Sequence, residues 1–178
     1  KTPLISMISM VEQMESRLKT AHYPQALEIS KNISMLSQYT IFLIDDIINY
    51  SSGDNRELVI SQEPIRIVQL LEFCYDIMKC LIKYGTGKKS KMCAKIKLED
   101  GMEDIVITSD PLRLKQILLN FISNAIKFTK VGYVLIAARE IKGQIIIYIK
   151  DTGIGMQDNI LKMLLAENEE HREINMSI

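Results

Sequence analysis

The sequence is poor in several residue types. Among its 178 residues there are no tryptophans, 6% aromatic residues, three cysteines and two histidines. Neither sign of charge is in excess, because 22 Lys and Arg residues balance 22 Asp and Glu residues. A neutral chain has no overall field to attract nucleic acid or an anionic membrane, so we predict neither as a partner. Any anion must be bound by a local group of side chains.

The few cysteines and histidines argue against two kinds of site. Cys74, Cys80 and Cys93 form no paired CxxC spacing, which argues against a disulfide framework and suits a reducing compartment. We expect these thiols to be inert and buried or partly buried. His22 and His171 are far apart in the sequence and neither has a second histidine or a cysteine beside it, so we predict no metal site built on them.

The sequence also lacks a long hydrophobic run. The longest, over residues 41–48, is interrupted by Asp45 and Asp46 and is well short of the roughly 20 residues that span a bilayer. We therefore predict no membrane segment in this chain, and a cytoplasmic location. Because the sequence starts at Lys1 without Met and without a signal-like segment, we expect it to be part of a longer protein. Any membrane anchor of that protein would precede Lys1.

Hydrophobic residues make up 47% of the chain, enough for a core of ordinary size. Their spacing of three and four residues predicts helices over 4–14, 27–48, 67–84 and 112–128. Strands are predicted over 57–62, 91–98, 105–108, 133–140 and 144–150, the last two joined by a turn at Lys142-Gly143. This order of elements predicts an α+β fold with helices on one face of a mixed sheet.

The first two predicted helices precede a small polar cluster at 53–56, which we take as a domain boundary. We expect these helices to form an antiparallel hairpin over 1–53, followed by a second domain over 57–178. Such a hairpin cannot bury its apolar stripe alone. The residues leave open two ways to bury this stripe. The stripe packs on the rest of this chain, or two copies of the hairpin form a four-helix bundle.

Polar residues mark one side of the predicted helix over 112–128. Asn120, Asn124 and Lys127 fall at i, i+4 and i+7, so two amides and an ammonium share one face. Amide oxygens are suitable ligands for Mg²⁺, and an ammonium neutralises phosphate, so this face can hold a metal and phosphates. An Asn on a helix often faces only solvent, so the face by itself is weak evidence.

A second polar group lies at the end of the last predicted strand. Asp151 follows the strand and precedes Gly153 and Gly155, where the chain opens into a loop. Glycines let the backbone of such a loop approach a flat ligand closely, and a carboxylate there can accept a hydrogen bond from an exocyclic amine. A DxGxG turn alone is a weak signal, but its occurrence with the helix face strengthens both.

These segments resemble a known family. The stretch DPLRLKQILLNFISNAIKFT at 110–129 resembles the N box of sensor histidine kinases, and DTGIGM at 151–156 is similar to their G1 box. KTPL at 1–4 is similar to the end of their H box, whose phosphorylated histidine would lie three residues before Lys1. The resemblance implies a dimerisation and histidine-phosphotransfer hairpin over 1–53 that lacks its histidine. It implies a catalytic ATP-binding domain of the GHKL type over 57–178.

The resemblance also implies ATP and Mg²⁺ as cofactors. In the family's pattern Asn124 holds the ion and Asn120 helps to orient it and its water. Lys127 reaches phosphate, and Asn120 and Lys127 are the implied catalytic residues within this chain.

The remaining implied roles belong to the G1 loop and the amino end. Asp151 would recognise adenine, in a pocket shaped by Gly153 and Gly155. Thr2 would stand at the position that helps to place water for dephosphorylating the phosphohistidine.

The resemblance ends after Met156, because neither the aromatic F box nor the Gly-rich G2 box of the family is visible. We therefore expect a truncated domain that is inactive alone. The implied function of the parent is phosphorylation of a histidine by ATP and relay to an aspartate of a response-regulator receiver domain. The implied assembly is a homodimer formed by the helix hairpin.

Two other functions are weighed against this one. The first is a non-catalytic dimerisation or partner-binding module derived from such a kinase, which the missing boxes favour and the intact polar face disfavours. The second is an ATP hydrolase that shares the nucleotide fold. Such hydrolases usually have Glu where Asn120 stands, and an amide cannot serve as the base that activates water.

Overall fold

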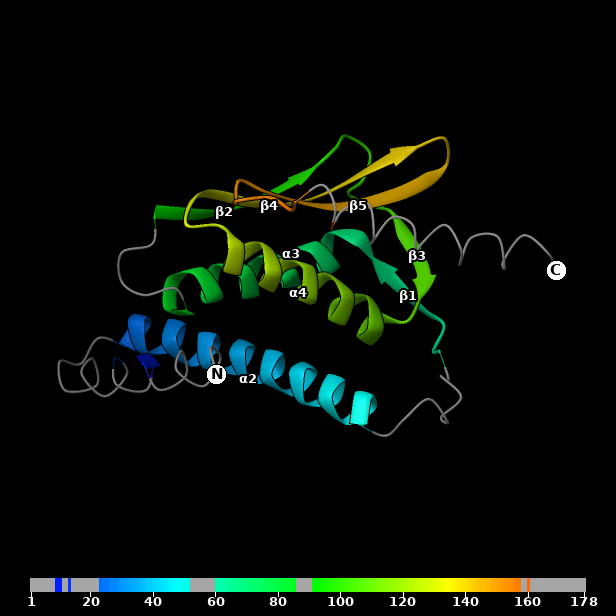
Figure 1. The fold of residues 1–178 in the computed structure, drawn as a ribbon. Helices are drawn as coiled ribbons and strands as arrows, with labels where there is room; N and C mark the ends of the chain where they lie inside the picture. The colour runs from blue at the N-terminus through cyan, green and yellow to red at the C-terminus, as the bar shows by residue number, and fades with distance from the viewer. Residues whose placement is uncertain are drawn as a thin grey trace.

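The computed structural model describes residues 9–10, 13, 23–51, 60–85, 91–157 and 160. A sheet, a pair of helices and a further long helix form successive layers (Figure 1). The elements are α2 (Tyr23–Ser51), β1 (Glu63–Arg66), α3 (Ile67–Cys80), the π-helical turn η1 (Leu81–Gly85), β2 (Lys91–Leu98), β3 (Val106–Ser109), α4 (Pro111–Phe128), β4 (Val131–Ile141) and β5 (Gln144–Asp151). Most of the helix expected over 4–14, the boundary at 53–56 and both histidines lie outside the described residues.

The main sheet has three strands in the order β2-β4-β5. β2 pairs with β4 in parallel and β4 pairs with β5 antiparallel, so the sheet is mixed as predicted. The β4–β5 turn was also predicted correctly. Lys142 and Gly143 both have positive φ, 52° and 78°, as a two-residue hairpin turn that matches the strand twist requires.

The first strand is not where the sequence pattern placed it. Residues 60–62 of the expected strand over 57–62 are not in a strand, and β1 is formed by Glu63–Arg66, paired antiparallel with β3. The Ser61 N–H donates a hydrogen bond to Asp110 Oδ2 at 3.1 Å, although 49 residues separate them. This bond to a side chain takes the place of a strand ladder at Ser61, and no local pattern reveals it.

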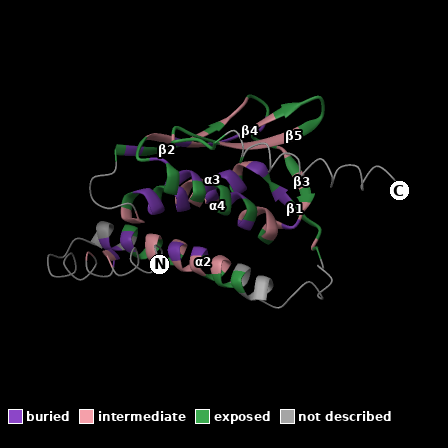
Figure 2. Cartoon of the chain, in the orientation of Figure 1, coloured by how far each residue is buried: buried purple, intermediate pink, exposed green. Residues whose placement is uncertain are grey.

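The core lies between the main sheet and the helices (Figure 2). In β4, Val134, Ile136 and Ala138 are fully buried on the same face of the sheet, as the two-residue period of a strand requires. α3 is buried on most of its circumference because it lies between the sheet and α2. Its buried residues are Ile67, Leu70, Leu71, Cys74, Ile77, Met78 and Cys80.

The long helix α2 begins at Tyr23, earlier than the helix predicted over 27–48, so Pro24 lies in its first turn. Proline is tolerated there because the first N–H groups of a helix have no intrahelical partner. α2 packs on α3 through an edge-to-face pair of Phe42 and Phe73, with ring centroids 6.3 Å apart. Part of its apolar surface therefore packs on the rest of this chain.

The three cysteines behave differently from one another. Cys74 and Cys80 are buried, and burial raises the pKa of their thiols to about 12 and about 11. Both therefore fit the prediction of inert thiols. Cys93 is exposed, contrary to the expectation of burial, because its position on β2 points away from the helices. In the described part of the chain, no helix is both long and apolar enough to cross a membrane.

Candidate functional site

Helix α4 carries the predicted polar face and begins at a well-formed cap. The Asp110 carboxylate accepts from the Leu112 and Arg113 N–H groups at 2.9 and 3.0 Å, and Pro111 occupies the first turn. These bonds satisfy backbone donors that the helix itself leaves unpaired. The Arg113 N–H, with those of Ser61 and Leu112, also lowers the pKa of Asp110. The helix start, and with it the phase of the whole helix, is thereby fixed.

The phase of α4 places the predicted residues on its outer side. Asn120, Asn124 and Lys127 are all exposed, whereas Leu119 and Ile122 on the opposite side are almost fully buried. Asn120 and Lys127 lie seven residues apart, which is roughly 10 Å along a helix axis. The three polar side chains thus form an accessible row that runs toward the carboxyl end of α4.

The loop after β5 is anchored beside that end of α4. The Ile154 N–H donates to the carbonyl of Phe128 at 3.3 Å. The Thr152 hydroxyl accepts from the Tyr133 N–H at 2.9 Å and lies 3.2 Å from the carbonyl oxygen of Val131. The loop is therefore tied both to the last residue of α4 and to the first residues of β4. Hereafter residues 151–155 are called the glycine loop.

Within the glycine loop Asp151 organises its own surroundings. The Gly153 N–H donates to Asp151 Oδ1 at 2.8 Å. No hydrogen bond from a described residue is given to the other carboxylate oxygen. Asp151 is exposed, so this second oxygen is accessible to a ligand. One oxygen of the Asp151 carboxylate is thus held by the Gly153 N–H, and the other is exposed.

Gly153 is required by the close approach of the glycine loop to α4. A Cβ at this position would lie 2.6 Å from the Phe128 carbonyl oxygen and 2.8 Å from Asp151 Oδ1. Gly155 has φ +70°, a backbone conformation that favours glycine. Sequence analysis missed Gly132, whose φ of +113° and missing side chain make room for Thr152. A glycine three residues after the N box was the available signal.

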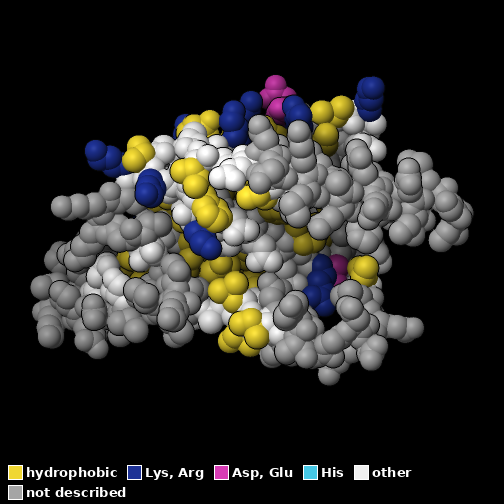
Figure 3. Space-filling view, viewed as in Figure 1, with side chains coloured by type: hydrophobic (Ala, Val, Ile, Leu, Met, Phe, Trp, Pro, Cys, Tyr) yellow, Lys and Arg dark blue, Asp and Glu magenta, His cyan; other side chains and the backbone are white. Residues whose placement is uncertain are grey.

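Apolar side chains surround the polar row. Phe121 and Phe128 on α4 are 59% and 47% exposed, and Ile154 and Met156 after the glycine loop are 79% and 62% exposed. Figure 3 shows apolar side chains over the helix layer, with basic side chains among them. The place of Phe128 on the outer side of α4 leaves it half exposed. Exposed rings beside polar groups suit a ligand with a flat apolar part.

The sequence predicted three groups of site residues: the polar face of α4, the glycine loop and Thr2. The structure places the first two beside each other. The glycine loop contacts Phe128 at the carboxyl end of α4, next in the chain to Lys127, and Asn120 and Asn124 lie farther back on the same face as Lys127. Thr2 lies outside the described residues. In the described part no three His, Cys, Asp or Glu side chains are grouped for a metal. The donor set at this site is therefore neutral amides, which fit Mg²⁺ where phosphates and water supply the other ligands.

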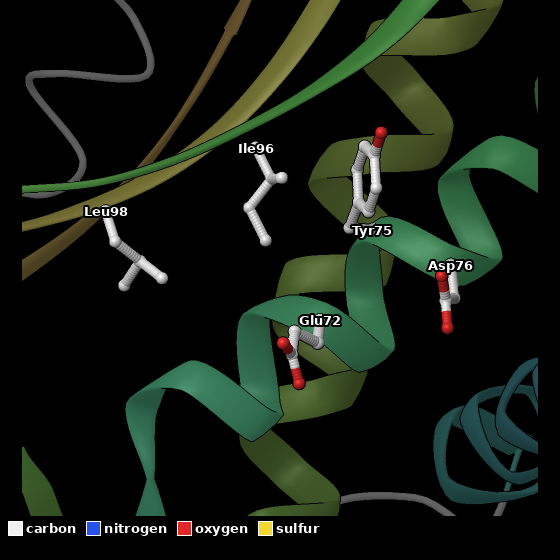
Figure 4. Close-up of a pocket in the computed structure, with 5 residues that line it drawn as sticks. All are labelled: Glu72, Tyr75, Asp76, Ile96 and Leu98. Atoms are coloured by element: carbon white, nitrogen blue, oxygen red, sulfur yellow. The ribbon is translucent and has the colours of Figure 1, made fainter. Parts of the chain in front are cut away.

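A separate groove lies in another part of the described structure. It measures about 530 Å³ and runs between α3 and β2, with Ile96 and Leu98 from the strand facing Glu72 and Tyr75 of the helix (Figure 4). β2 and β5 occupy opposite edges of the main sheet, so this groove is remote from the glycine loop. It contains none of the predicted site residues.

Comparison with known proteins points to one family. Residues 109–175 match the family described as histidine kinase-, DNA gyrase B-, and HSP90-like ATPase. The sensor histidine kinase GacS of Pseudomonas protegens is 28% identical over 169 residues, covering 92% of this chain and 17% of that protein. The signal transduction histidine-protein kinase BarA of Escherichia coli K12 is 29% identical over 163 residues, covering 89% and 17%. The chain thus spans less than a fifth of the length of these relatives.

Solved structures agree in fold. The histidine kinase AdeS of Acinetobacter baumannii aligns with a TM-score of 0.52 at 18% identity, covering 89% of this chain and 74% of that one. Full-length ShkA in complex with AMPPNP aligns with a TM-score of 0.55 at 25% identity, covering 76% and 28%. Residues 109–175 thus match the histidine kinase-, DNA gyrase B-, and HSP90-like ATPase family, and nearly the whole chain is similar in sequence to sensor histidine kinases.

Proposed function

We propose that this chain binds ATP together with Mg²⁺ at the outer face of α4 and the glycine loop, as the nucleotide-binding part of a sensor histidine kinase. One observation carries the proposal. An accessible row of two amides and a lysine leads to a loop that holds an open carboxylate against the end of the same helix. A nucleotide has the matching order of groups, with phosphates at one end and an exocyclic amine at the other.

Each side chain has a role that its position supports. Asp151, with one oxygen held by Gly153, would accept from the adenine amine through the other. Lys127 would neutralise phosphate, and Asn124 with Asn120 would hold Mg²⁺ through amide oxygens. Bound Mg²⁺ supplies charge neutralisation between the phosphates. Gly153 and Gly155 would keep the loop close enough for these contacts.

The test of nucleotide binding is calorimetric titration of the folded protein with ATP. We expect saturable binding in Mg²⁺ that weakens roughly tenfold or more when EDTA removes the ion, because uncompensated phosphate charge then faces the site. GTP is the matched control ligand, since its ring carries a carbonyl where adenine has the amine, and it should bind more weakly. Equal affinity for ATP with and without Mg²⁺ would contradict the proposal that Mg²⁺ binds with the nucleotide. Absence of ATP binding would contradict the proposed nucleotide site.

We infer further that the whole protein transfers the γ-phosphoryl group from ATP to a histidine before Lys1. The bond from γ-phosphorus to the bridging oxygen of ADP breaks, a bond to an imidazole nitrogen forms, and the imidazole proton is lost. The phosphoryl group would then pass from the histidine to an aspartate of a receiver domain. In a separate reaction, Thr2 would help to place water that hydrolyses the phosphohistidine to histidine and inorganic phosphate. The names of the relatives support this inference.

The transfer step is tested in a longer protein that supplies the histidine. Incubation with γ-labelled ATP should give a protein-bound label that acid releases and alkali retains, as a phosphohistidine does. Replacing that histidine by Gln should remove the label. A label that survives acid, or none in a protein that binds ATP, would contradict the transfer.

We also infer a homodimer formed through α2. One side of α2 packs on α3, but Ile41, Ile44 and Ile47 on another side are 56%, 49% and 67% exposed. They recur at intervals of three residues, so they form a stripe along one side of the helix. The sequence left open whether the apolar stripe packs on the rest of this chain or on a second copy. α2 is compatible with both, because one side packs on α3 and another side has exposed isoleucines.

A second candidate function is a partner-binding module without ATP turnover. The exposed apolar side chains around the glycine loop favour it, because such groups also suit contact with another protein. The ATP titration separates the two candidates.

A further inference from the structure

Thr129 ends helix α4 with a side chain whose chemistry is unexplained by the fold. Its N–H closes the last helical turn on the Ala125 carbonyl at 3.0 Å. The residue is only 3% exposed, and among the described residues its hydroxyl has no hydrogen-bond partner. A buried hydroxyl without a partner destabilises the folded state, and valine would fill the same volume without that penalty. Packing alone therefore does not account for the hydroxyl.

The position of Thr129 indicates which segment would supply a hydrogen-bond partner for its hydroxyl. It directly follows Phe128, whose carbonyl oxygen accepts from Ile154 and limits the side chain at Gly153. The glycine loop is thus in contact with the peptide unit that joins Phe128 to Thr129. Because the hydroxyl is buried from solvent, a new partner has to come from movement of a neighbouring segment.

The glycine loop is anchored at Thr152 and Ile154, but its glycines give its backbone more conformational freedom than other residues would. It has glycines at positions 153 and 155, and Gly155 already adopts a φ of +70°. Asp151 at the start of the loop is exposed, and one of its carboxylate oxygens accepts from the Gly153 N–H, so a ligand bound to Asp151 would be coupled to the backbone of the loop. Hydrogen bonds of this kind commonly become well formed only in the complex with ligand.

We propose that Thr129 is a positioning residue whose hydroxyl gains its hydrogen-bond partner from the glycine loop when a nucleotide binds to Asp151. The inference rests on the proposed function, because the loop needs a ligand to move it. The unpaired hydroxyl raises the free energy of the unliganded protein, and binding relieves that cost. Part of the affinity for nucleotide thus depends on a residue that need not touch it.

The test compares Thr129→Val with Thr129→Ser in the full chain, by thermal melting without ligand and by calorimetric titration with ATP and Mg²⁺. Thr129→Val should melt at the same temperature or higher, since an unpaired buried hydroxyl is lost. Its Kd for ATP should rise roughly three- to tenfold, the value of one neutral hydrogen bond. Thr129→Ser retains the hydroxyl and should keep the affinity within about twofold.

The matched control is Thr40→Val on α2, whose hydroxyl donates to the Leu36 carbonyl at 2.9 Å, remote from the loop. Its affinity for ATP should not change. A Thr129→Val protein that binds ATP as tightly as the native protein would overturn the inference, whatever its melting temperature. A native protein that does not bind ATP at all would overturn the proposed function, and the inference with it.

Discussion

Replacing Asp151 by Asn is expected to weaken the binding of ATP by roughly 30- to 100-fold. The carboxylate is the charged acceptor that the proposal assigns to the adenine amine, and a hydrogen bond to a charged group contributes about 2 to 3 kcal/mol. Asn has nearly the same shape but only one oxygen. If that oxygen keeps its bond with the Gly153 N–H, an amide NH₂ is turned toward the amine, and donor then faces donor. Calorimetric titration in Mg²⁺ measures the change.

Asp100→Asn is the matched control for this variant. Asp100 is an exposed carboxylate in the connection between β2 and β3, away from β5, so the same loss of charge there should leave ATP affinity unchanged. Melting curves of both variants establish that each is folded. An unchanged affinity in Asp151→Asn would place the nucleotide elsewhere or rule out this mode of recognition.

Replacing Ile44 by Asp is expected to convert a dimer into a monomer. Ile44 is 49% exposed in the single chain, so the change costs little in the core, but at the centre of a four-helix interface it would bury one carboxylate from each copy. An unpaired buried charge costs several kcal/mol, so the dissociation constant should rise roughly 100-fold or more. Sedimentation velocity over a range of protein concentrations measures this.

Ile60→Asp provides the comparison, since Ile60 is 58% exposed and lies outside α2. That variant should remain a dimer. A native protein that sediments as a monomer at every concentration would contradict the homodimer. A dimeric Ile44→Asp protein would show that α2 does not form the interface.

Several elements were predictable because their causes are local. The spacing of apolar residues gave the correct extent of α4, and Asp110 with Pro111 marked its start through a cap that involves only neighbouring residues. The turn at Lys142-Gly143 likewise needs only two residues that accept positive φ. The roles of Asn120, Asn124 and Asp151 stay predictions, although all three side chains are accessible where those roles require it.

Other features depended on contacts between distant segments. Residues 60–62 were predicted to be in a strand but precede β1, because Ser61 bonds to Asp110, far along the chain, and no pattern near Ser61 records that bond. The buried, unpaired hydroxyl of Thr129 was missed for the same reason. Burial is a property of the packed molecule and cannot be read from residues 127–129 alone.

Local sequence therefore sufficed for the family resemblance, for most helices and strands, and for the row of polar residues on α4, because periodicity and caps act within a few residues. Tertiary packing decided which side of α2 lies against α3 and which stays exposed, since several apolar residues are available on both sides. It also decided that Gly153 must be a glycine, because the obstacle is the carbonyl of Phe128, on an element that only folding brings beside the loop.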